Sequence, residues 1–277
     1  MIPELSTRNI LVYMGFHVVT YILIVYVLAK GHLKNKNNTE LNKKYAPFVR
    51  NDLDKWSIIW NFPFYITFWP RIFVAFLLAV SCPIWINLCM IGVDTKTPVI
   101  GPWRKWLIKE IIKFHSGVLL LMGGLVWYNI ERVSTGEGDY RKWLGPDWKP
   151  EWEGSGTIVS NHVCWFDIIL MQHLYVYSFV CKASVRNYFG IGKCAIATDC
   201  LFLGAAGTRE EKIAVGKSIE SRQAENEKYG RSPLVIFPEG ATTNNESVIK
   251  FKRGPFSGLS SVQPLGVKYW SLNGISP

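Results

Sequence analysis

The chain has 277 residues, of which 49% are hydrophobic, 14% are aromatic and only 19% carry a charge. This composition excludes an intrinsically disordered protein and argues against an ordinary soluble domain, because so many aromatic side chains need apolar surroundings. The formal net charge of +10 indicates an anionic partner, which is nucleic acid, an anionic bilayer or a phosphate-bearing substrate, and the hydrophobicity favours the membrane.

The N-terminal region predicts a retained transmembrane helix within residues 1–30. The segment Ile10–Ala29 holds twenty residues without a charge, and at about 1.5 Å per residue such a helix spans a hydrocarbon core of about 30 Å. A cleaved signal peptide is disfavoured, because Lys30 follows the run where a small-residue cleavage site is needed. We interpret His17, inside the run, as a packing partner of another helix in preference to a functional group.

Residues 31–71 are rich in Asn and Lys and are expected to form a basic polar linker. Their basic excess places them on the non-translocated side of the membrane, where they also adhere to anionic headgroups. We expect the domain that follows to lie on this same side.

The region 72–130 is expected to contain a kinked hydrophobic helix followed by interfacial helices. The segment Ile72–Val93 is long enough to span a membrane, but Pro83 near its middle removes a helix hydrogen bond and favours a bend. Basic residues flank both ends, so a re-entrant or interfacial helix and a true span both remain open. The amphipathic stretch 103–116 is expected to lie flat on the headgroups, and the run Gly117–Trp127 is too short to span.

Beyond residue 131, short apolar runs alternate with helical stretches. We expect strands at 157–160, 177–184, 194–203, 233–240 and 261–270, helices from Asp167 onwards and over 208–230, and a surface loop at 140–153. This alternation predicts an α/β fold with a central mixed or parallel sheet and flanking helices. The fold class is therefore a membrane-anchored α/β domain, residues 131–277, preceded by N-terminal hydrophobic helices.

Six cysteines are scattered through apolar runs, and none of them forms a C-x-x-C pair. We expect free, buried thiols on a reducing side of the membrane in preference to disulfides or a zinc site. They are Cys82, Cys89, Cys164, Cys181, Cys194 and Cys200.

The most informative motif is NHVCWFD at residues 161–167, in which His162 ends a predicted strand and Asp167 begins the next helix. This spacing closes a turn in which the Asp167 carboxylate reaches the imidazole, fixes its tautomer and leaves the other ring nitrogen as a general base. A metal site lacks a third ligand, because His173 is expected on another face of the helix. Alone, an H-x4-D spacing is a weak signal.

Further motifs follow in order: GAAGTR (204–209), FPEG (237–240), FKRG (251–254) and VQP (262–264). Together with the H-x4-D motif, this set resembles the PlsC-like glycerophospholipid acyltransferase family. Within that family it is most similar to lysophospholipid acyltransferases of the lysophosphatidylcholine type, on YAPFVRNDLDKW (45–56), FWPRIF (68–73), NHVCWFDIIL and FPEGATTN. The resemblance covers roughly residues 45 to 270, apart from 133–156.

The resemblance implies an acyl-CoA-dependent transfer to a lysophospholipid or acylglycerol phosphate at the membrane surface. His162 would deprotonate the acceptor hydroxyl, which attacks the acyl-CoA thioester, and Asp167 would orient His162. No metal, further cofactor or covalent enzyme intermediate is implied. The implied partners are acyl-CoA, a lysophospholipid and membrane lipids.

The resemblance also implies a set of substrate-binding residues. They are Gly204, Arg209, Phe237, Pro238, Glu239, Gly240 and Pro264, with Lys182, Lys252 and Arg253 either attracting the CoA phosphates or forming a solvated basic rim. In this set Arg209 and Glu239 would position the glycerol-phosphate part of the acceptor, and Pro264 would shape the acyl pocket. A planar, permanently charged guanidinium suits a phosphate.

Two features depart from the family pattern. Ala241 stands where the family usually has Thr or Ser, and only thirteen residues follow Pro264, where relatives ordinarily continue for several elements. We therefore expect a domain that is short at its C-terminus. This expectation supports an alternative function, a structural subunit of a large membrane complex with weak or no activity, although the His162–Asp167 motif favours an enzyme. The endoplasmic reticulum is the expected location, and the mitochondrial inner membrane is the second choice.

Overall fold

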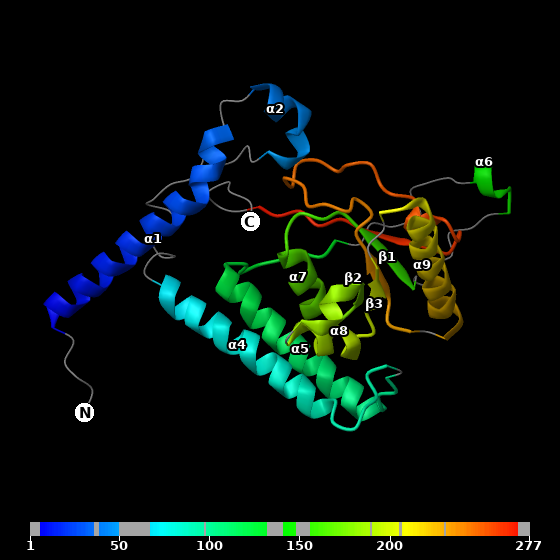
Figure 1. The fold of residues 1–277 in the computed structure, drawn as a ribbon, viewed down its shortest axis with the longest axis horizontal. Coiled ribbons are helices and arrows are strands. Elements are labelled where there is room, and N and C mark those ends of the chain that lie inside the picture. Colours follow the sequence, from blue (N-terminus) through cyan, green and yellow to red (C-terminus); the bar gives the residue numbers. More distant parts are fainter. Residues whose placement is uncertain are drawn as a thin grey trace.

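A computed structural model describes residues 6–35, 39–49, 67–96, 98–131, 141–147, 156–188, 190–204, 207–229 and 231–270. Its centre is a five-stranded, fully parallel sheet in the order β3-β2-β4-β1-β5 (Figure 1). The strands are β1 (Thr157–Ser160), β2 (Ser178–Lys182), β3 (Leu201–Leu203), β4 (Leu234–Ile236) and β5 (Gln263–Leu265). Residues 36–38 and 50–66 of the predicted linker, and residues 140 and 148–153 of the predicted surface loop, lie outside the described residues.

Helices cover both faces of this sheet and confirm the predicted α/β fold class. They are α1 (Thr7–Asn35), α2 (Thr39–Lys44), α4 (Phe68–Cys89), α5 (Pro102–Gly123), α6 (Arg141–Leu144), α7 (Phe166–Leu174), α8 (Ile191–Ala197) and α9 (Arg209–Tyr229). Short 3-10 turns are η1 (Ala46–Phe48), η4 (Ala183–Asn187) and η5 (Gly254–Phe256).

Alternate side chains of the strands pack on opposite faces of the sheet. Val235 of β4 packs with Met171 of α7, whereas its neighbour Leu234 packs with Ile219 of α9. Because successive side chains of a strand point to opposite faces, the central strand β4 contributes to both hydrophobic clusters, and all three of its residues are buried. Helix α9 therefore covers one face of the sheet and α7 covers the other.

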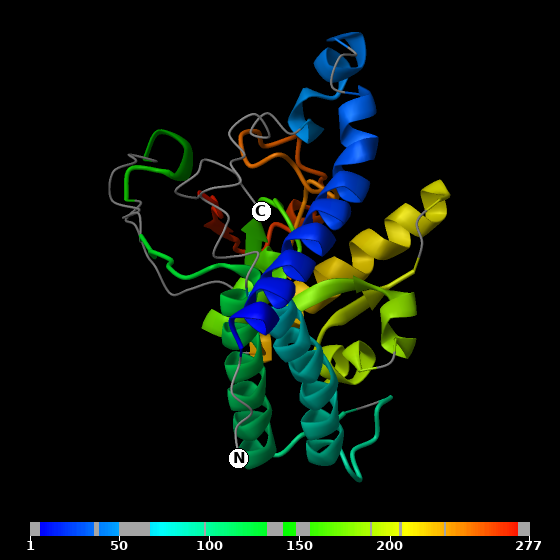
Figure 2. The same ribbon diagram turned by 90° about the vertical axis from the view of Figure 1, so that its left-hand side faces the viewer.

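Helices α4 and α5 form an antiparallel pair outside α7 and α8 (Figure 2). Ile86 of α4, Ile108 of α5 and Ile196 of α8 share one buried cluster. An arginine near the start of each long helix binds carbonyl groups at the end of the other. Arg71 Nε donates to Met122 O at 2.7 Å, and Arg104 donates to Ile91 O at 2.9 Å. Both contacts satisfy carbonyls that a helix terminus leaves without an intrahelical partner.

The predicted strand at 194–203 is wrong over its first half. Cys194–Ala197 belongs to helix α8, and only Leu201–Leu203 is a strand. Ile196 is buried against α4 and α5, and the helix ends with Asp199 at a φ of 61° and a hydrogen bond of 2.9 Å from Cys200 N to Ala195 O. This is the hydrogen-bond pattern of a Schellman cap. A short apolar run without clear periodicity does not separate a buried helix from a strand.

Helix α5 joins two segments that the sequence analysis treated separately. It runs unbroken from Pro102 to Gly123 and ends at Gly124, which has a φ of 96° and serves as a left-handed cap. Its C-terminal half packs on α7 through Gly117 and Gly123, and Leu120 is buried while Leu121 is half exposed. Whether the stretch 103–116 rests on a membrane stays a prediction.

Among the described residues, α4 is the one helix that is long and apolar enough, by length and composition, to cross a membrane. It continues through Pro83 as a single helix, and the predicted bend stays a prediction. Helix α1 contains the predicted N-terminal hydrophobic segment, and its crossing of a membrane also stays a prediction. The two helices touch through Trp69, whose Nε1 donates to Thr20 Oγ1 at 3.3 Å. His17 is buried, with its ring 4.1 Å from that of Tyr13.

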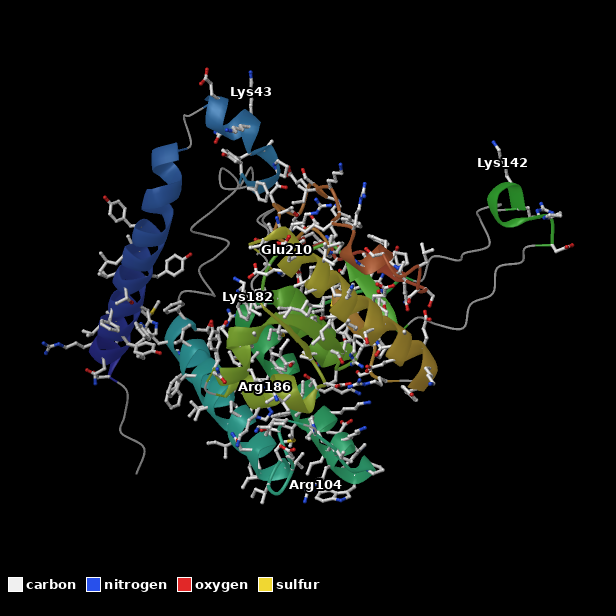
Figure 3. The ribbon with its side chains drawn as sticks, turned by 45° about the vertical axis from the view of Figure 1, so that its right-hand side comes forward. Lys43, Arg104, Lys142, Lys182, Arg186 and Glu210 are labelled. Carbon is white, nitrogen blue, oxygen red and sulfur yellow. The ribbon has the colours of Figure 1, made fainter. Side chains whose placement is uncertain are left out.

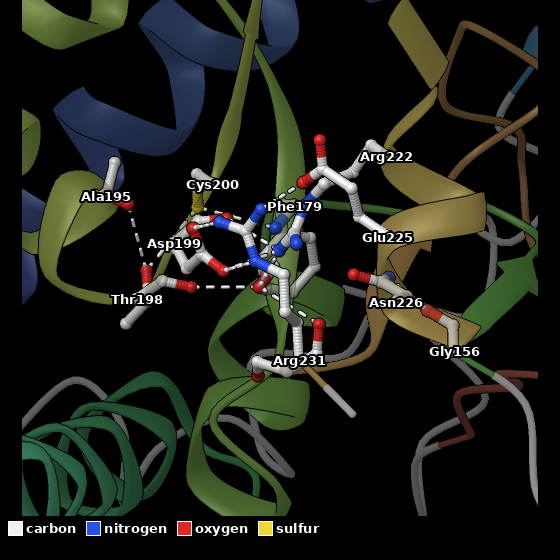
Figure 4. A network of polar contacts seen from close by, with 12 residues as sticks. Gly156, Phe179, Ala195, Thr198, Asp199, Cys200, Arg222, Glu225, Asn226 and Arg231 are labelled. Atoms are coloured by element: carbon white, nitrogen blue, oxygen red, sulfur yellow. Dashed lines mark hydrogen bonds and ion pairs between the residues drawn. The ribbon is translucent and has the colours of Figure 1, made fainter. Parts of the chain in front are cut away.

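A network of charged side chains fastens the amino-terminal edge of the sheet (Figure 4). Arg222 of α9 is buried and donates to Asp199 Oδ2 at 2.7 Å, and Arg231 binds both Asp199 and Glu225. A cavity of about 470 Å³ borders these residues. Because Asp199 precedes β3 and Arg231 precedes β4, this cavity lies at the opposite edge of the sheet from His162, which follows β1.

Two glycines of α5 allow the close approach of α7, and this approach predicts a stability effect. A Cβ at Gly123 would lie 2.3 Å from Phe166 Cζ, and a Cβ at Gly117 would lie 2.7 Å from His173 Nδ1. Phe166 is buried, so it cannot move aside without opening the core. We expect Gly123→Ala to lower the free energy of unfolding by about 1–3 kcal/mol, as overpacked cores do. Thermal unfolding of the purified protein in detergent measures this change.

Gly216 in α9 supplies the matched control, because no atom lies within 4 Å of a Cβ built there. Gly216→Ala is expected to raise the free energy of unfolding by about 0.5–1 kcal/mol, since alanine costs less backbone entropy in a helix. Equal effects of the two substitutions would contradict the proposed helix contact.

Candidate active site

The structure brings His162 and Asp167 together at the carboxyl edge of the sheet. Strand β1 ends at Ser160, and Asp167 lies in the first turn of α7. His162 Nδ1 lies 2.7 Å from Asp167 Oδ2. A carboxylate only accepts hydrogen bonds, so Nδ1 carries the proton and Nε2 has the free electron pair of a general base. The hydrogen-bonded pair that the spacing predicts is confirmed.

The Asp167 carboxylate is fully buried and receives four donors. Its Oδ2 accepts the backbone N–H groups of Val163 and Cys164, at 2.7 and 3.1 Å, in addition to the imidazole. Its Oδ1 accepts the Tyr269 hydroxyl at 2.7 Å. The carboxylate is thereby held in one orientation, and its negative charge is matched by converging donors. The motif search did not find Tyr269, which lies 102 residues away in sequence.

The FPEG turn after β4 forms the neighbouring wall of the site. The ring of Phe237 stacks on the His162 imidazole, with centroids 4.1 Å apart and planes 17° from parallel. Glu239 is buried, and its Oε1 accepts the backbone N–H of His162 at 2.9 Å while its Oε2 accepts the N–H of Ile249 at 3.0 Å. Both oxygens of Glu239 therefore bind the backbone and hold the loop that carries His162 against the turn. The implied contact of Glu239 with an acceptor stays a prediction.

Two features of the local geometry require a glycine at position 240. Gly240 has a φ of 69°, in the left-handed region that favours glycine, and a Cβ there would lie 2.1 Å from Lys252 Nζ. The Lys252 backbone N–H also donates to Pro238 O at 2.9 Å. The FPEG and FKRG motifs therefore meet in space, and the Lys252 ammonium lies against the turn that supports His162.

The other predicted binding residues lie at the same sheet edge but are not joined to the pair by any contact between described residues. Lys182 ends β2, Gly204 follows β3, and Arg209 is the first residue of α9. Two strands, β4 and β2, lie between β1 and β3, so at about 4.8 Å per strand the end of β3 lies roughly 14 Å across the sheet from the end of β1. Pro264 is exposed on β5, opposite Val159 of β1. Figure 3 shows Lys182 among the side chains of this region.

A capping box fixes the backbone at Arg209. Glu211 accepts the N–H groups of Gly207 and Thr208, at 2.7 and 2.9 Å, and Glu211 N donates to Thr208 Oγ1 at 3.2 Å. These backbone hydrogen bonds lower the pKa of Glu211 and keep it ionised. The carboxylate of Glu211 thereby occupies the N–H groups of Gly207 and Thr208, just before α9, and Arg209, the first residue of the helix, is exposed.

A distant segment is attached to the loop beside the pair. Thr243 N donates to His162 O at 2.8 Å, and the next residue, Asn244, binds the carbonyls of Ala46, Pro47 and Val49 at 3.1, 2.8 and 3.0 Å. The YAPF segment thus lies next to Asn244, which is 195 to 198 residues away from it in sequence, and close to the loop that carries His162.

Two further expectations concern histidine and cysteine chemistry. His173 does not approach the pair, because its Nδ1 lies 3.0 Å from Lys113 O of α5. All six cysteines are free thiols that are partly or fully buried, as predicted. Burial raises the pKa of the Cys164 thiol, and the Asp167 charge raises it further, so Cys164 remains a neutral group beside the pair.

The fold and the site define the class of protein, and a comparison with known families agrees. The acyltransferase family matches residues 130–267, which include the sheet, the His162–Asp167 pair and the FPEG turn. The chain belongs to this PlsC-like acyltransferase family.

Its relatives are lipid acyltransferases. A lysophospholipid acyltransferase of Arabidopsis thaliana is 27% identical over 269 residues, which cover 83% of this chain and 67% of the relative. A lyso-ornithine lipid O-acyltransferase of Pseudomonas aeruginosa is 38% identical over 115 residues, 40% of this chain and 42% of the relative. A lysophosphatidylcholine acyltransferase of Mus musculus is 26% identical over 212 residues, 73% of this chain and 37% of the relative. No solved structure gives a significant match.

Proposed function

We propose that this protein transfers an acyl group from acyl-CoA to the free hydroxyl of a lysophospholipid or acylglycerol phosphate at a membrane surface. The observation that carries the proposal is the 2.7 Å hydrogen bond between His162 and Asp167 at the carboxyl edge of the sheet. Ligand sites of parallel α/β sheets lie at this edge. The similarity to a lysophospholipid acyltransferase over 83% of the chain supports the choice of acceptor.

The geometry supports a direct transfer. His162 Nε2 takes the proton of the acceptor hydroxyl as the oxygen attacks the thioester carbonyl carbon. The tetrahedral intermediate then collapses, the carbon–sulfur bond breaks, and the imidazolium returns the proton to the departing CoA sulfur. The products are an ester and free CoA. Asp167 stabilises the imidazolium between these two steps, and the stacked Phe237 ring keeps the imidazole in plane.

The outer surface of α4 supports work at a membrane. Its apolar side chains face away from the fold, among them Phe73, Phe76, Ile84 and Trp85, each of which is more than half exposed. The adjoining helix α5 adds exposed Trp103. Burying these side chains in lipid removes apolar area from water. This placement brings the acyl chains of both substrates to the protein along the bilayer.

Incubation of the purified full chain with labelled acyl-CoA tests the proposal. The acceptors are lysophosphatidylcholine, lysophosphatidylethanolamine, lysophosphatidic acid, glycerol 3-phosphate and lyso-ornithine lipid. We expect a labelled diacyl phospholipid and one free CoA thiol per ester formed. Acylation of glycerol 3-phosphate or lyso-ornithine lipid alone would overturn the proposed acceptor. The alternative of a structural subunit with weak or no activity predicts no product above the level of a His162→Ala variant.

Arg209 is proposed to bind the acceptor phosphate. Arg209 is exposed at the start of α9, and it follows β3 at the same sheet edge at which His162 follows β1. We expect Arg209→Ala to raise the acceptor KM by about tenfold with a smaller change in kcat, because a charge-assisted contact to a non-reacting group is lost. Steady-state kinetics on lysophosphatidic acid measure both constants.

Two comparisons test this role of Arg209. Lys212→Ala, which removes another exposed cation from the same helix, should leave the KM unchanged. Monoacylglycerol, an acceptor without phosphate, should be used equally well by the Arg209→Ala variant and the original protein. An equal loss of activity on both acceptors would count against phosphate binding.

A further inference from the structure

Tyr269 makes a buried contact with the catalytic carboxylate that the proposed reaction has not yet used. Its hydroxyl donates to Asp167 Oδ1 at 2.7 Å, and its side chain is 5% exposed. The partner oxygen belongs to a carboxylate with no solvent exposure. Burial raises the pKa of the Tyr269 phenol, and the hydrogen bond to Asp167 raises it further, so the hydroxyl remains a donor throughout the working pH range.

The backbone of Tyr269 is itself fixed by the loop that follows the FPEG motif. Tyr269 N donates to Asn245 Oδ1 at 2.9 Å, and Asn245 Nδ2 donates back to Tyr269 O at 2.5 Å. Nearby, Asn161 forms the same reciprocal pair with Val267, through its Oδ1 at 2.7 Å and its Nδ2 at 2.8 Å. The side chains of Asn161 and Asn245 therefore hold the segment after β5 in place, and this positions the Tyr269 phenol within hydrogen-bond distance of Asp167.

We propose that Tyr269 is a positioning residue of the acyl transfer, which holds Asp167 so that its Oδ2 faces the His162 imidazole. The inference rests on the proposed function for its catalytic consequence, although its structural part does not. The two oxygens of Asp167 bind different donors. Oδ1 binds only the phenol among the described contacts, and Oδ2 binds the imidazole and two backbone N–H groups. Loss of the phenol leaves Oδ1 buried without a donor.

The phenol also determines how strongly the carboxylate attracts the proton on His162. A hydrogen bond to Oδ1 spreads the negative charge of Asp167, so its removal strengthens the attraction of Oδ2 for the imidazolium. The pKa of His162 then rises. The other ionisable groups near the pair are the Cys164 thiol, the Glu239 carboxylate and the Lys252 ammonium at the FPEG turn. Of these groups, the Cys164 thiol also forms a hydrogen bond with the Tyr269 hydroxyl, and because this thiol stays neutral, the loss of that contact adds no charge beside the pair.

The test compares Tyr269→Phe with the original chain. We expect kcat to fall roughly tenfold, with little change in KM, because a hydrogen bond to a charged group is lost at a residue that does not touch the substrate. The base must be neutral to work, so activity disappears as the pH falls through the pKa of His162. The acidic limb of the kcat/KM profile should therefore move upwards by about half a pH unit.

A titration of His162 by NMR separates this inference from the proposed function, because it needs no turnover. The chain contains five histidines, and the His162→Ala variant identifies the signal. Tyr269→Phe should raise the measured pKa of His162, and 3-fluorotyrosine at position 269, a stronger donor of the same shape, should lower it. Tyr175→Phe removes a phenol that stacks on Tyr177, away from Asp167, and should change neither pKa nor kcat.

The possible results of the titration distinguish the positioning role of Tyr269 from the proposed acyltransferase function. An unchanged His162 titration in both the Phe and fluorotyrosine proteins would overturn the positioning role, even if the original chain is an active acyltransferase. If the His162 titration shifts but the original chain acylates no acceptor, the contact between Tyr269 and Asp167 is supported and the proposed acyltransferase function is contradicted. If Tyr269→Phe does not fold, the fluorotyrosine protein alone still gives the direction of the shift, and a rise would contradict the inference.

Discussion

Replacing His162 by alanine is expected to abolish acyl transfer while the protein remains folded. General-base catalysis contributes about 100- to 10,000-fold to a rate, and Nε2 of His162 is the base in the proposed reaction. The fold should tolerate the loss, because the buried Asp167 keeps three donors, from Val163, Cys164 and Tyr269. Steady-state rates with acyl-CoA and a lysophospholipid, together with the melting temperature, measure the two effects separately.

Asp167→Asn is the informative companion to this variant and should affect both properties. The amide has one acceptor oxygen for the four donors that now converge on the carboxylate, so its NH2 group faces another donor. Activity should fall because the imidazole loses the acceptor that fixes its tautomer. The melting temperature should fall as well, unlike that of His162→Ala. Full activity in either variant would show that the pair does not perform the chemistry.

The order of elements could be predicted from sequence because the apolar runs of a parallel sheet are short, buried and bounded by turn residues. The runs at 157–160 and 177–184 correspond to β1 and β2. The runs at 233–240 and 261–270 were too long, since β4 and β5 hold only three residues each. Several of their remaining residues are apolar because they line the site and the core, as Phe237 and Tyr269 do. Hydrophobicity reports burial, and it does not distinguish a strand from a buried turn.

The catalytic pair could be predicted because both residues lie within one turn, where spacing alone limits the geometry. Its support could not be predicted in the same way. Tyr269, Asn245 and Glu239 act through contacts spanning 24 to 102 residues, and a single chain carries no local pattern for such contacts. The resemblance implied that Glu239 contacts the substrate, which stays a prediction, and the structure adds that both of its oxygens bind backbone N–H groups. Motif membership indicated importance but left the physical role open.

The backbone contacts of Glu239 predict the second large effect. Glu239→Gln should lower both the melting temperature and kcat, while the acceptor KM changes little. The glutamine keeps one oxygen, so its NH2 group faces the N–H of either His162 or Ile249, which now donate to Oε1 and Oε2. A buried donor without an acceptor costs about 1–3 kcal/mol. For a chain of this size each kcal/mol lowers the melting temperature by about 2–4 °C.

The expected loss of activity follows from the backbone of His162. Glu239 is 3% exposed, so water cannot replace the missing acceptor, and the catalytic loop must shift to relieve the contact between two donors. A displacement of about 1 Å at a catalytic group costs on the order of 100-fold in rate. Glu246→Gln is the matched control, because this exposed carboxylate lies in the same loop and its change should leave kcat and the melting temperature unaltered. If Glu239 instead bound the acceptor, Glu239→Gln would raise the KM at an unchanged melting temperature, and saturating acceptor would restore the rate.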